Sequence, residues 1–375
     1  MAADYLPYGH QQLSEEDISA VIKALRSDWL TTGPKVTEFE KSLSEYVGCE
    51  HVVAVSSGTA ALHAACYAAG ITEGDEVLVP AITFAATANA VIYCGGIPIF
   101  ADVDPDTLLV DVASIEAKIS SRTKAIIAVD YAGQPCDYDV LHQLAKAYNL
   151  VLIADASHSL GAALYGRRCG SLADITTFSF HPVKPLTTAE GGAVCTGRPA
   201  YADRMQRFRN HGISTEQQQR SDWRYEMTDL GYNYRLSDLQ CALGISQLKN
   251  LDTRITRRQT LAATYHQYLD ERKTLRPLRT LPGVDHGYHL FVIKVPACTR
   301  EDIFHQMRQQ GIGVNVHYLP VYLHPFYRQR FGHGRGLCPL AEQVYNEILT
   351  LPIFPAMTEG DVERVVAALQ RCCGE

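Results

Sequence analysis

The chain has 375 residues, of which 46% are hydrophobic and 20% are charged, as is typical of a soluble globular protein with about two domains. Its formal net charge of -7 offers no basic surface to a nucleic-acid backbone. No segment approaches the ~20 apolar residues of a membrane-spanning helix, and the beginning, MAADYLPYGHQQL, lacks the order of a signal peptide. We therefore expect a cytoplasmic protein that binds neither nucleic acid nor a membrane.

The eleven cysteines and fourteen histidines do not indicate a metal site. The chain contains neither a CxxC pair nor an HExxH motif, so neither zinc coordination nor a redox dithiol is supported. We expect the cysteines to be buried apolar side chains of a protein in a reducing compartment.

In chain order, the first predicted element is a helix after Ser14, a good N-cap that is followed by three acidic residues at 15–17. Short apolar segments then alternate with amphipathic ones, and the strand candidates are residues 51–56, 76–80, 97–103, 124–130, 150–155, 175–180 and 191–196. Several are apolar on both faces, as in a parallel sheet covered by helices. We therefore predict an α/β domain with a central, mostly parallel sheet.

Helical periodicity next runs through residues 237–269 without a break. A strand at 289–295, a helix at 299–310, a second strand at 313–319 and closing helices follow, a pattern that predicts a smaller α+β domain. We place the boundary near residue 250, which gives domains of residues 1–250 and 251–375.

The first chemical signal is the segment SSGTAAL, residues 56–62, where a predicted strand ends in a turn that opens a helix. Free backbone N–H groups and the helix dipole can hold an anion there, which makes Ser57, Gly58 and Thr59 candidate phosphate ligands, with Ser179 as a nearby hydroxyl. Neither a Walker lysine nor GxGxxG is present, which disfavours nucleoside triphosphates and dinucleotides. Helix capping alone is the alternative interpretation.

The second signal is Asp155, the last residue of a predicted strand, whose carboxylate is expected at the ligand-binding edge of the sheet. It suits a protonated ring nitrogen, although a helix N-cap is the alternative. His158 follows and could stack on, or hydrogen-bond to, the same ligand. Phe84, directly after another strand, is a candidate to cover an aromatic ring, with burial in the core as the alternative.

The third signal is Lys184, which lies between two prolines just beyond the predicted strand 175–180 and can reach the same crevice as Asp155. A lysine with a depressed pKa forms a Schiff base with an aldehyde, whereas a surface role is the alternative for this residue taken alone. A phosphate anchor, an acid for a pyridine nitrogen and an imine-forming lysine together describe a site for pyridoxal 5′-phosphate.

Six motifs in this order resemble those of a known family: SSGTAAL (56–62), VPAITFAATANAV (79–91), VDYAGQP (129–135), DASHSLGA (155–162), SFHPVKPLTTAEGGAV (179–194) and GYNYRLSDLQCALG (231–244). Over about residues 8–325 the chain is similar to the DegT/DnrJ/EryC1/StrS sugar aminotransferases, which have the fold-type I architecture of pyridoxal phosphate enzymes. The resemblance implies transfer of an amino group from L-glutamate to a 4-keto-6-deoxy UDP-sugar. It also implies a homodimer whose active sites are shared between subunits.

The resemblance assigns a role to each matched residue. Lys184 would carry the cofactor and move protons, Asp155 would keep the pyridine nitrogen protonated, and Phe84 would stack on the ring. His158 would lie at the phenolic oxygen, and Asn233 would reach the phosphate in the partner's site. The implied substrate-side residues, for which plain loop or strand residues are the alternative, are Tyr8, Trp29, Leu30, Thr31, Thr32, Asn315, Val316, His317 and Tyr318.

Two further functions remain open. One is a nucleotide-sugar aminotransferase with a different sugar stereochemistry, and the other is a non-catalytic ligand-binding regulator on the same fold. Related 3-dehydratases have histidine in place of the lysine, so Lys184 favours amino transfer, and Lys184 with Asp155 argues against the regulator.

Overall fold

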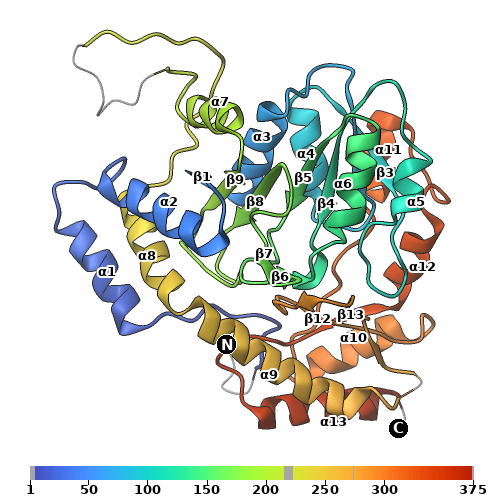
Figure 1. Cartoon of the computed structure of the whole chain (residues 1–375). Coiled ribbons are helices and arrows are strands. Elements are labelled where there is room, and N and C mark those ends of the chain that lie inside the picture. The colour runs from blue at the N-terminus through green and yellow to red at the C-terminus, as the bar shows by residue number, and fades with distance from the viewer. Residues whose placement is uncertain (1–4, 215–222, 273, 374–375) are drawn as a thin grey trace.

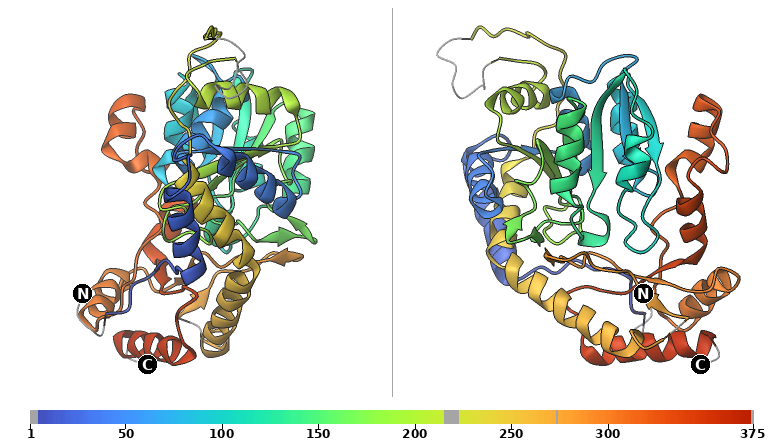
Figure 2. Two further views of the ribbon diagram at one scale, coloured as in Figure 1. Left: turned by 90° about the vertical axis from the view of Figure 1, so that its left-hand side faces the viewer. Right: turned by 45° about the vertical axis from the view of Figure 1, so that its right-hand side comes forward.

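The computed structural model of the chain describes residues 5–214, 223–272 and 274–373. A large sheet with helices on both faces forms the upper part in Figure 1, and a smaller layer of helices and short strands lies below it. The turned views in Figure 2 show the same two parts, with the C-terminal helix at the base. Among the described residues, no helix is long and apolar enough to cross a membrane.

The large sheet has seven strands, and only β9 runs antiparallel to its neighbours. In spatial order the strands are β1 (His51–Val55), β9 (Gly192–Thr196), β8 (Ile175–Ser179), β5 (Val151–Asp155), β4 (Thr123–Val129), β2 (Glu76–Pro80) and β3 (Ile97–Ala101). β2 and β9 are buried along their whole length, which explains why they are apolar on both faces. The predicted mostly parallel sheet is confirmed, and each predicted strand is correct to within two residues at either end.

Helices connect these strands and cover the sheet. They are α3 (Gly58–Ala68), α4 (Ala85–Tyr93), α5 (Val112–Glu116), the 3₁₀ turn η1 (Tyr131–Gly133), α6 (Tyr138–Ala147) and α7 (Pro199–Arg209). A short second sheet at the base of this domain consists of β6 (Ala163–Leu164), β7 (Arg167–Arg168) and β11 (Val284–Asp285). Seven of the eleven cysteines are buried, as an apolar role requires.

The N-terminal layer consists of α1 (Glu15–Leu25), α2 (Pro34–Val47) and α8 (Asp238–Lys249), which pack on one another. Ser14 is the predicted N-cap of α1: its Oγ accepts the Asp17 N–H at 3.3 Å, and the Asp17 carboxylate accepts the Ser14 N–H at 2.9 Å. This reciprocal capping box fixes where α1 begins.

The helical structure predicted over residues 237–269 is confirmed, but it is divided into two helices. Asn250 leaves helical geometry, with φ -108° and ψ 11°, and separates α8 from α9 (Leu251–Leu269). Asparagine competes with the helix for backbone hydrogen bonds, which favours it at helix ends. α8 packs against α1 and α2, whereas α9 contacts the C-terminal helix α13 (Glu359–Cys373). We propose that the two domains meet at this break.

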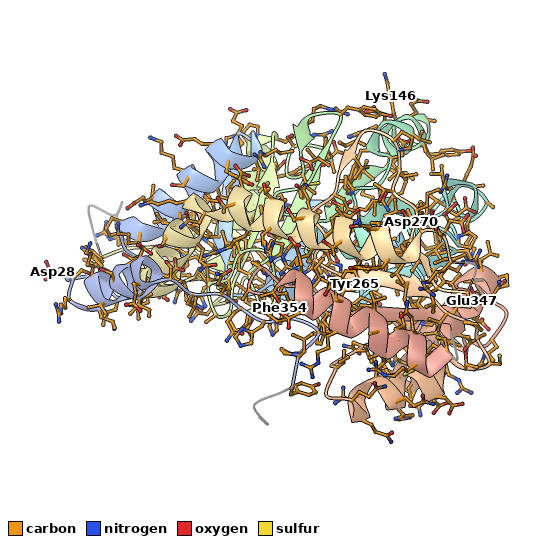
Figure 3. The ribbon with its side chains drawn as sticks, turned by 90° about the horizontal axis from the view of Figure 1, so that it is seen from below. Asp28, Lys146, Tyr265, Asp270, Glu347 and Phe354 are labelled. Carbon is orange, nitrogen blue, oxygen red and sulfur yellow. The ribbon has the colours of Figure 1, made fainter. Side chains whose placement is uncertain are left out.

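The smaller domain is built on a three-stranded antiparallel sheet of β10 (Arg276–Pro277), β12 (Phe291–Lys294) and β13 (Ile348–Leu351). It also contains α10 (Arg300–Gln309), η3 (Val321–Leu323), α11 (Pro325–Phe331) and α12 (Pro339–Glu347). Tyr265 of α9 is labelled in Figure 3, and its ring stacks on that of Phe291 in β12 with 4.5 Å between the ring centroids. Its hydroxyl donates to the Pro352 carbonyl at 2.8 Å.

The predicted second strand at residues 313–319 was also wrong. Only Asn315 makes an isolated bridge, to Thr350 of β13. Asn315 exchanges two backbone hydrogen bonds with Thr350, but the residues on either side bond elsewhere. The Gly313 N–H donates to the Leu6 carbonyl at 2.7 Å, and the Tyr131 hydroxyl of the large domain donates to the His317 carbonyl, so the segment does not run along the small sheet.

A buried ion pair protects β1, which is an edge strand of the large sheet. The Ala54 N–H donates to the Glu40 carboxylate at 2.8 Å, and the Ala54 carbonyl accepts from the Arg209 guanidinium at 2.9 Å. Glu40 of α2 and Arg209 of α7 also pair with each other. Two side chains therefore supply the partners that a neighbouring strand would give, just before the SSGT turn.

We predict that Arg209→Met lowers the free energy of unfolding by about 3–5 kcal/mol, because Glu40 is then left buried without its cation. Urea denaturation followed by circular dichroism measures the change. Lys41→Met is the matched control, since Lys41 forms an exposed pair with Glu45 on α2, and it should cost at most about 0.5 kcal/mol. Equal effects of the two substitutions would contradict the role of the pair.

Candidate active site

A cavity of about 520 Å³ lies at the carboxyl ends of β5 and β8, and we call it the site cavity. Thirteen residues predicted from the sequence line it: Tyr8, Ser57, Gly58, Thr59, Phe84, Asp155, His158, Ser179, Lys184, Asn315, Val316, His317 and Tyr318. The other lining residues are Leu62, Thr83, Ala86, Val129, Ser157, His181, Val183, Glu190 and His289. Parallel strands place their carboxyl ends at one edge, which is why motifs far apart in the sequence meet here.

The N-terminus of α3 forms one end of the site cavity. Ser57 is the N-cap, and its Oγ accepts the Ala60 N–H at 3.0 Å. The N–H groups of Gly58 and Thr59 precede the first intrahelical hydrogen bond, and among the described residues they have no acceptor. Capping and anion binding are therefore compatible: the Ser57 side chain caps the helix while two N–H groups remain available to an anion.

Glycine at position 58 permits this arrangement. A Cβ atom there would lie 2.7 Å from the Ser179 Cβ, and a Cβ on Gly192 would lie 2.5 Å from the Ser57 carbonyl oxygen. Any larger residue at either position would force α3 away from β8 and β9. The close approach puts the Ser179 hydroxyl beside the free N–H groups of α3.

Asp155 is buried at the end of β5 and is held by hydroxyl donors. The Thr87 Oγ1 donates to it at 2.7 Å, and the Ser157 Oγ and N–H donate at 2.6 and 3.2 Å. A turn and not a helix follows Asp155, so the structure excludes a helix N-cap role. The sequence analysis missed Thr87 and Ser157. Ser157 follows Asp155 by two residues, a spacing typical of a turn in which the aspartate side chain accepts a nearby backbone N–H.

Lys184 lies in the loop after β8, with its N–H bonded to the His181 carbonyl at 2.9 Å. Burial lowers the pKa of Lys184 to about 8, and the nearby Asp155 carboxylate opposes this shift. The depressed pKa that imine chemistry requires is therefore present, and part of the amine is unprotonated near neutral pH.

Phe84 belongs to the wall of the site cavity and not to the core. Its side chain is 60% exposed, although it directly follows the buried strand β2 and precedes α4. The alternative of a core phenylalanine is therefore excluded. An exposed ring on a cavity wall is available to stack on a planar ligand.

The segment 315–318 closes the opposite wall. The Tyr318 hydroxyl lies 3.3 Å from the His158 Nε2, and the His317 Nδ1 lies 2.8 Å from the Thr350 Oγ1. The ring of Tyr8 lies 5.5 Å from that of His317. Burial, with a smaller contribution from Lys184, lowers the pKa of His317 to about 3, so this imidazole is neutral at physiological pH.

Five predicted residues do not line the site cavity: Trp29, Leu30, Thr31, Thr32 and Asn233. Trp29 and Leu30 are each 48% exposed, and Asn233 is exposed while its backbone bridges to Asn210. The structure thus places the WLTTG turn and Asn233 at the surface.

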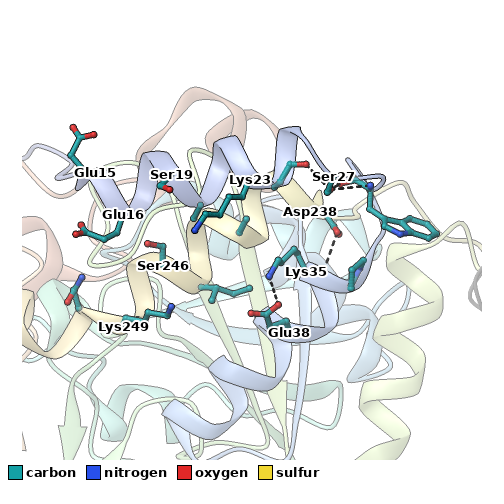
Figure 4. Close-up of a pocket in the computed structure, with 17 residues that line it drawn as sticks. Glu15, Glu16, Ser19, Lys23, Ser27, Lys35, Glu38, Asp238, Ser246 and Lys249 are labelled. Atoms are coloured by element: carbon teal, nitrogen blue, oxygen red, sulfur yellow. Dashed lines mark hydrogen bonds and ion pairs between the residues drawn. The ribbon is translucent and has the colours of Figure 1, made fainter.

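Asp238, in the same motif as Asn233, holds the WLTTG turn. Its carboxylate accepts the N–H groups of Gly33 and Lys35 at 2.7 and 3.2 Å, and its own N–H donates to the Thr31 carbonyl at 2.6 Å. Figure 4 shows Asp238 and Lys35 beside a second hollow of about 770 Å³ between α1, α2 and α8. This second hollow and the site cavity have no lining residue in common among the described residues.

The residues of the site cavity fit pyridoxal 5′-phosphate. Gly58 and Thr59 offer free N–H groups to a phosphate, and Asp155 offers a buried carboxylate to a ring nitrogen. Phe84 offers an exposed aromatic face, and Lys184 offers an amine to an aldehyde. Among the described residues, no group of three or more histidine, cysteine, aspartate or glutamate side chains could hold a metal ion.

Comparisons with known proteins agree with this fit. The model of the DegT/DnrJ/EryC1/StrS aminotransferase family matches residues 11–370. Spore coat polysaccharide biosynthesis protein SpsC from Bacillus subtilis is 37% identical over 375 residues, which cover 98% of this chain and 96% of SpsC. Helicobacter pylori PseC, an aminotransferase involved in the biosynthesis of pseudoaminic acid, has a similar structure, with a TM-score of 0.93 and 31% identity over 98% of this chain and 99% of PseC. The PLP-form of the putative sugar aminotransferase Spr1654 from Streptococcus pneumoniae gives a TM-score of 0.92 at 30% identity, with 99% of both chains covered.

We predict that the Lys184 amine in the cofactor-free protein loses its proton around pH 8, and not near the ordinary pKa of 10.5. Because only the unprotonated amine is nucleophilic, labelling of Lys184 by trace acetic anhydride should increase through pH 8 and then level off. Mass spectrometry of the Lys184 peptide measures this, and the exposed Lys146 is the reference lysine in the same samples. A labelling midpoint at pH 10.5 would show that burial does not lower the pKa of Lys184.

Proposed function

Because this chain belongs to the DegT/DnrJ/EryC1/StrS aminotransferase family, we propose that it transfers the amino group of L-glutamate to a 4-keto-6-deoxy UDP-sugar. It is a pyridoxal 5′-phosphate-dependent sugar aminotransferase with the fold-type I architecture. What we propose beyond this is the amino donor, the acceptor sugar and the number of subunits.

The observation that carries the proposal is that Lys184, Asp155 and the N-terminus of α3 meet on one cavity. When bound, pyridoxal phosphate supplies an aldehyde and an electron-withdrawing ring. Lys184 would hold the cofactor through its amine and, when that amine is free, would hold and return a proton at the reacting carbon. Asp155, fixed by Thr87 and Ser157, can accept a hydrogen bond from a protonated ring nitrogen.

For the product we propose UDP-4-amino-4,6-dideoxy-N-acetyl-β-L-altrosamine, an intermediate of pseudaminic acid synthesis. The similarity to PseC supports this choice, as do the segments FHPVKPLTTAEGGAV at 180–194 and NVHYLPVY at 315–322. The alternative is another nucleotide-sugar aminotransferase that acts on a different stereoisomer. The higher identity to SpsC, whose name refers to a spore coat polysaccharide, favours that alternative.

We also propose a homodimer with shared active sites. Asn233 and the WLTTG turn lie outside this chain's site cavity, yet Asp238 ties the turn to the segment that carries Asn233. Residues presented together on the surface are suited to complete the site of a second subunit.

We further propose a cytoplasmic location. The nucleotide-sugar substrate favours it, and so do the buried free thiols such as Cys136 and Cys169.

We predict that the protein releases 2-oxoglutarate from glutamate in the presence of one member of a panel of 4-keto-6-deoxy nucleotide sugars. Lys184→Ala should reduce this rate by about 10²–10⁴-fold or more, because the amine that moves protons is lost. Circular dichroism would verify that the variant is folded. A parent-like rate would remove Lys184 from the mechanism. If no sugar in the panel reacts while the cofactor spectrum still responds to glutamate, the proposed acceptor class is wrong.

The shared site can be tested by mixing two inactive variants, Lys184→Ala and Asn233→Ala. If Asn233 acts in the partner's site, each mixed dimer has one site with both defects and one with neither. Random exchange should then restore about a quarter of the parent activity, provided that the sites are independent. No recovery, once tagged pull-down has shown exchange and Asn233→Ala alone is impaired, would place both residues in one chain's site.

A further inference from the structure

Two imidazoles that come from different parts of the chain face each other at the wall of the site cavity. His158 lies on the turn after β5, and His289 lies just before β12. Their ring centroids are 4.5 Å apart with planes inclined by 43°, and each residue is only 5% exposed. The family resemblance assigns no role to His289, and the proposed amino transfer does not use it.

Hydrogen bonds alone do not orient these rings. The His158 Nε2 lies 3.3 Å from the Tyr318 hydroxyl, but the Nδ1 atoms of His158 and His289 are buried without a partner among the described residues. Such unpaired polar atoms cost free energy. Beside its one hydrogen bond, the His158 ring therefore has the ring of His289 as the neighbour that can restrain it.

The backbone of His289 is held on both sides. A Cβ on Gly133 would lie 2.9 Å from the His289 nitrogen and 3.0 Å from the His158 carbonyl oxygen, so this turn fits only with glycine at 133. The buried Arg258 of α9 donates to the carbonyls of Tyr288, His289 and Ile353 at 3.2, 3.3 and 2.9 Å. The turn at Gly133 thus sets His289 against the large domain, and Arg258 fixes the His289 backbone within the smaller domain.

The electrostatic surroundings keep both rings uncharged. Burial is the main cause that lowers the pKa of His158 and of His289 far below the ordinary value. Lys184 and His317 lower both further, and His289 also faces His158 and Arg258. Two neutral imidazoles can pack closely without repulsion, whereas a proton on either would charge a dry contact.

We propose that His289 is a positioning residue that holds the imidazole of His158 with its Nε2 turned toward Tyr318 and the site cavity. This inference rests on the proposed function in one respect, namely that His158 contacts the bound cofactor. It does not depend on which sugar is the acceptor.

The test measures the visible absorbance of the bound cofactor, its pH titration and the cofactor dissociation constant, all without sugar. We expect His289→Ala to shift the absorbance titration and to weaken cofactor binding by about tenfold. His289→Phe keeps a ring against His158 and should restore most of the parent behaviour. His286→Ala is the matched control, because His286 is buried on the same loop but stacks on Tyr288 outside the site cavity.

A double-mutant cycle distinguishes positioning from a merely structural role. If His289 acts through His158, His289→Ala should add nothing to the spectral shift that His158→Ala already causes. The proposal would be overturned if His289→Ala shifted the spectrum of the His158→Ala protein as much as it shifts that of the parent. So would a His289→Ala protein whose spectrum and titration match those of His286→Ala. Failure of the acceptor assignment would instead appear only when sugars are added.

Discussion

Helix α3 can approach the end of β8 only because residue 58 is a glycine, and the geometry of the site follows from this contact. It fixes the free N–H groups of Gly58 and Thr59 beside Ser179. Lys184 follows Ser179 by one short loop, and Asp155 ends the neighbouring strand β5. The contact of Gly58 with Ser179 therefore sets the anion-binding end against β8, and the pairing of β8 with β5 brings the loop of Lys184 close to Asp155. Gly192 on β9 maintains the same packing from the other side.

The second wall of the site comes from the smaller domain. The segment that carries His317 and Tyr318 touches the small sheet only at Asn315 and is also bonded to Leu6 and Tyr131. Arg258 links α9 to the backbone next to His289. Because the walls of the cavity belong to both domains, their relative placement must be preserved for the site to keep its shape. Backbone hydrogen bonds that cross between the two parts contribute to this placement: the Gly287 N–H donates to the Gly133 carbonyl at 2.9 Å, and the Leu290 N–H donates to the Ala132 carbonyl at 3.1 Å.

Local patterns predicted the large sheet and most of the cavity well, because buried parallel strands and strand-end turns have strong signatures over a few residues. Lys184, Asp155 and the SSGT turn are of this kind.

The predictions that failed depended on contacts between residues far apart in the sequence. Residues 313–319 read as a strand, but bonds to Leu6 and Tyr131, which no local pattern contains, draw them away from the sheet. Thr87 and His289 are ordinary residues in their own segments, and only the fold brings them to Asp155 and His158. The periodicity through 237–269 concealed the break at Asn250, since apolar spacing continues across it.

The exposure of Phe84 has a consequence for the stability of the folded chain. Its apolar ring, which is 60% exposed, would be covered by a planar ligand stacked on it. Ligand binding to the folded state alone adds about 2.7 kcal/mol of stability when the ligand concentration is a hundred times its dissociation constant. The cofactor would therefore stabilise the folded chain as well as take part in the reaction, and the ring of Phe84 is one of the surfaces through which it would do so.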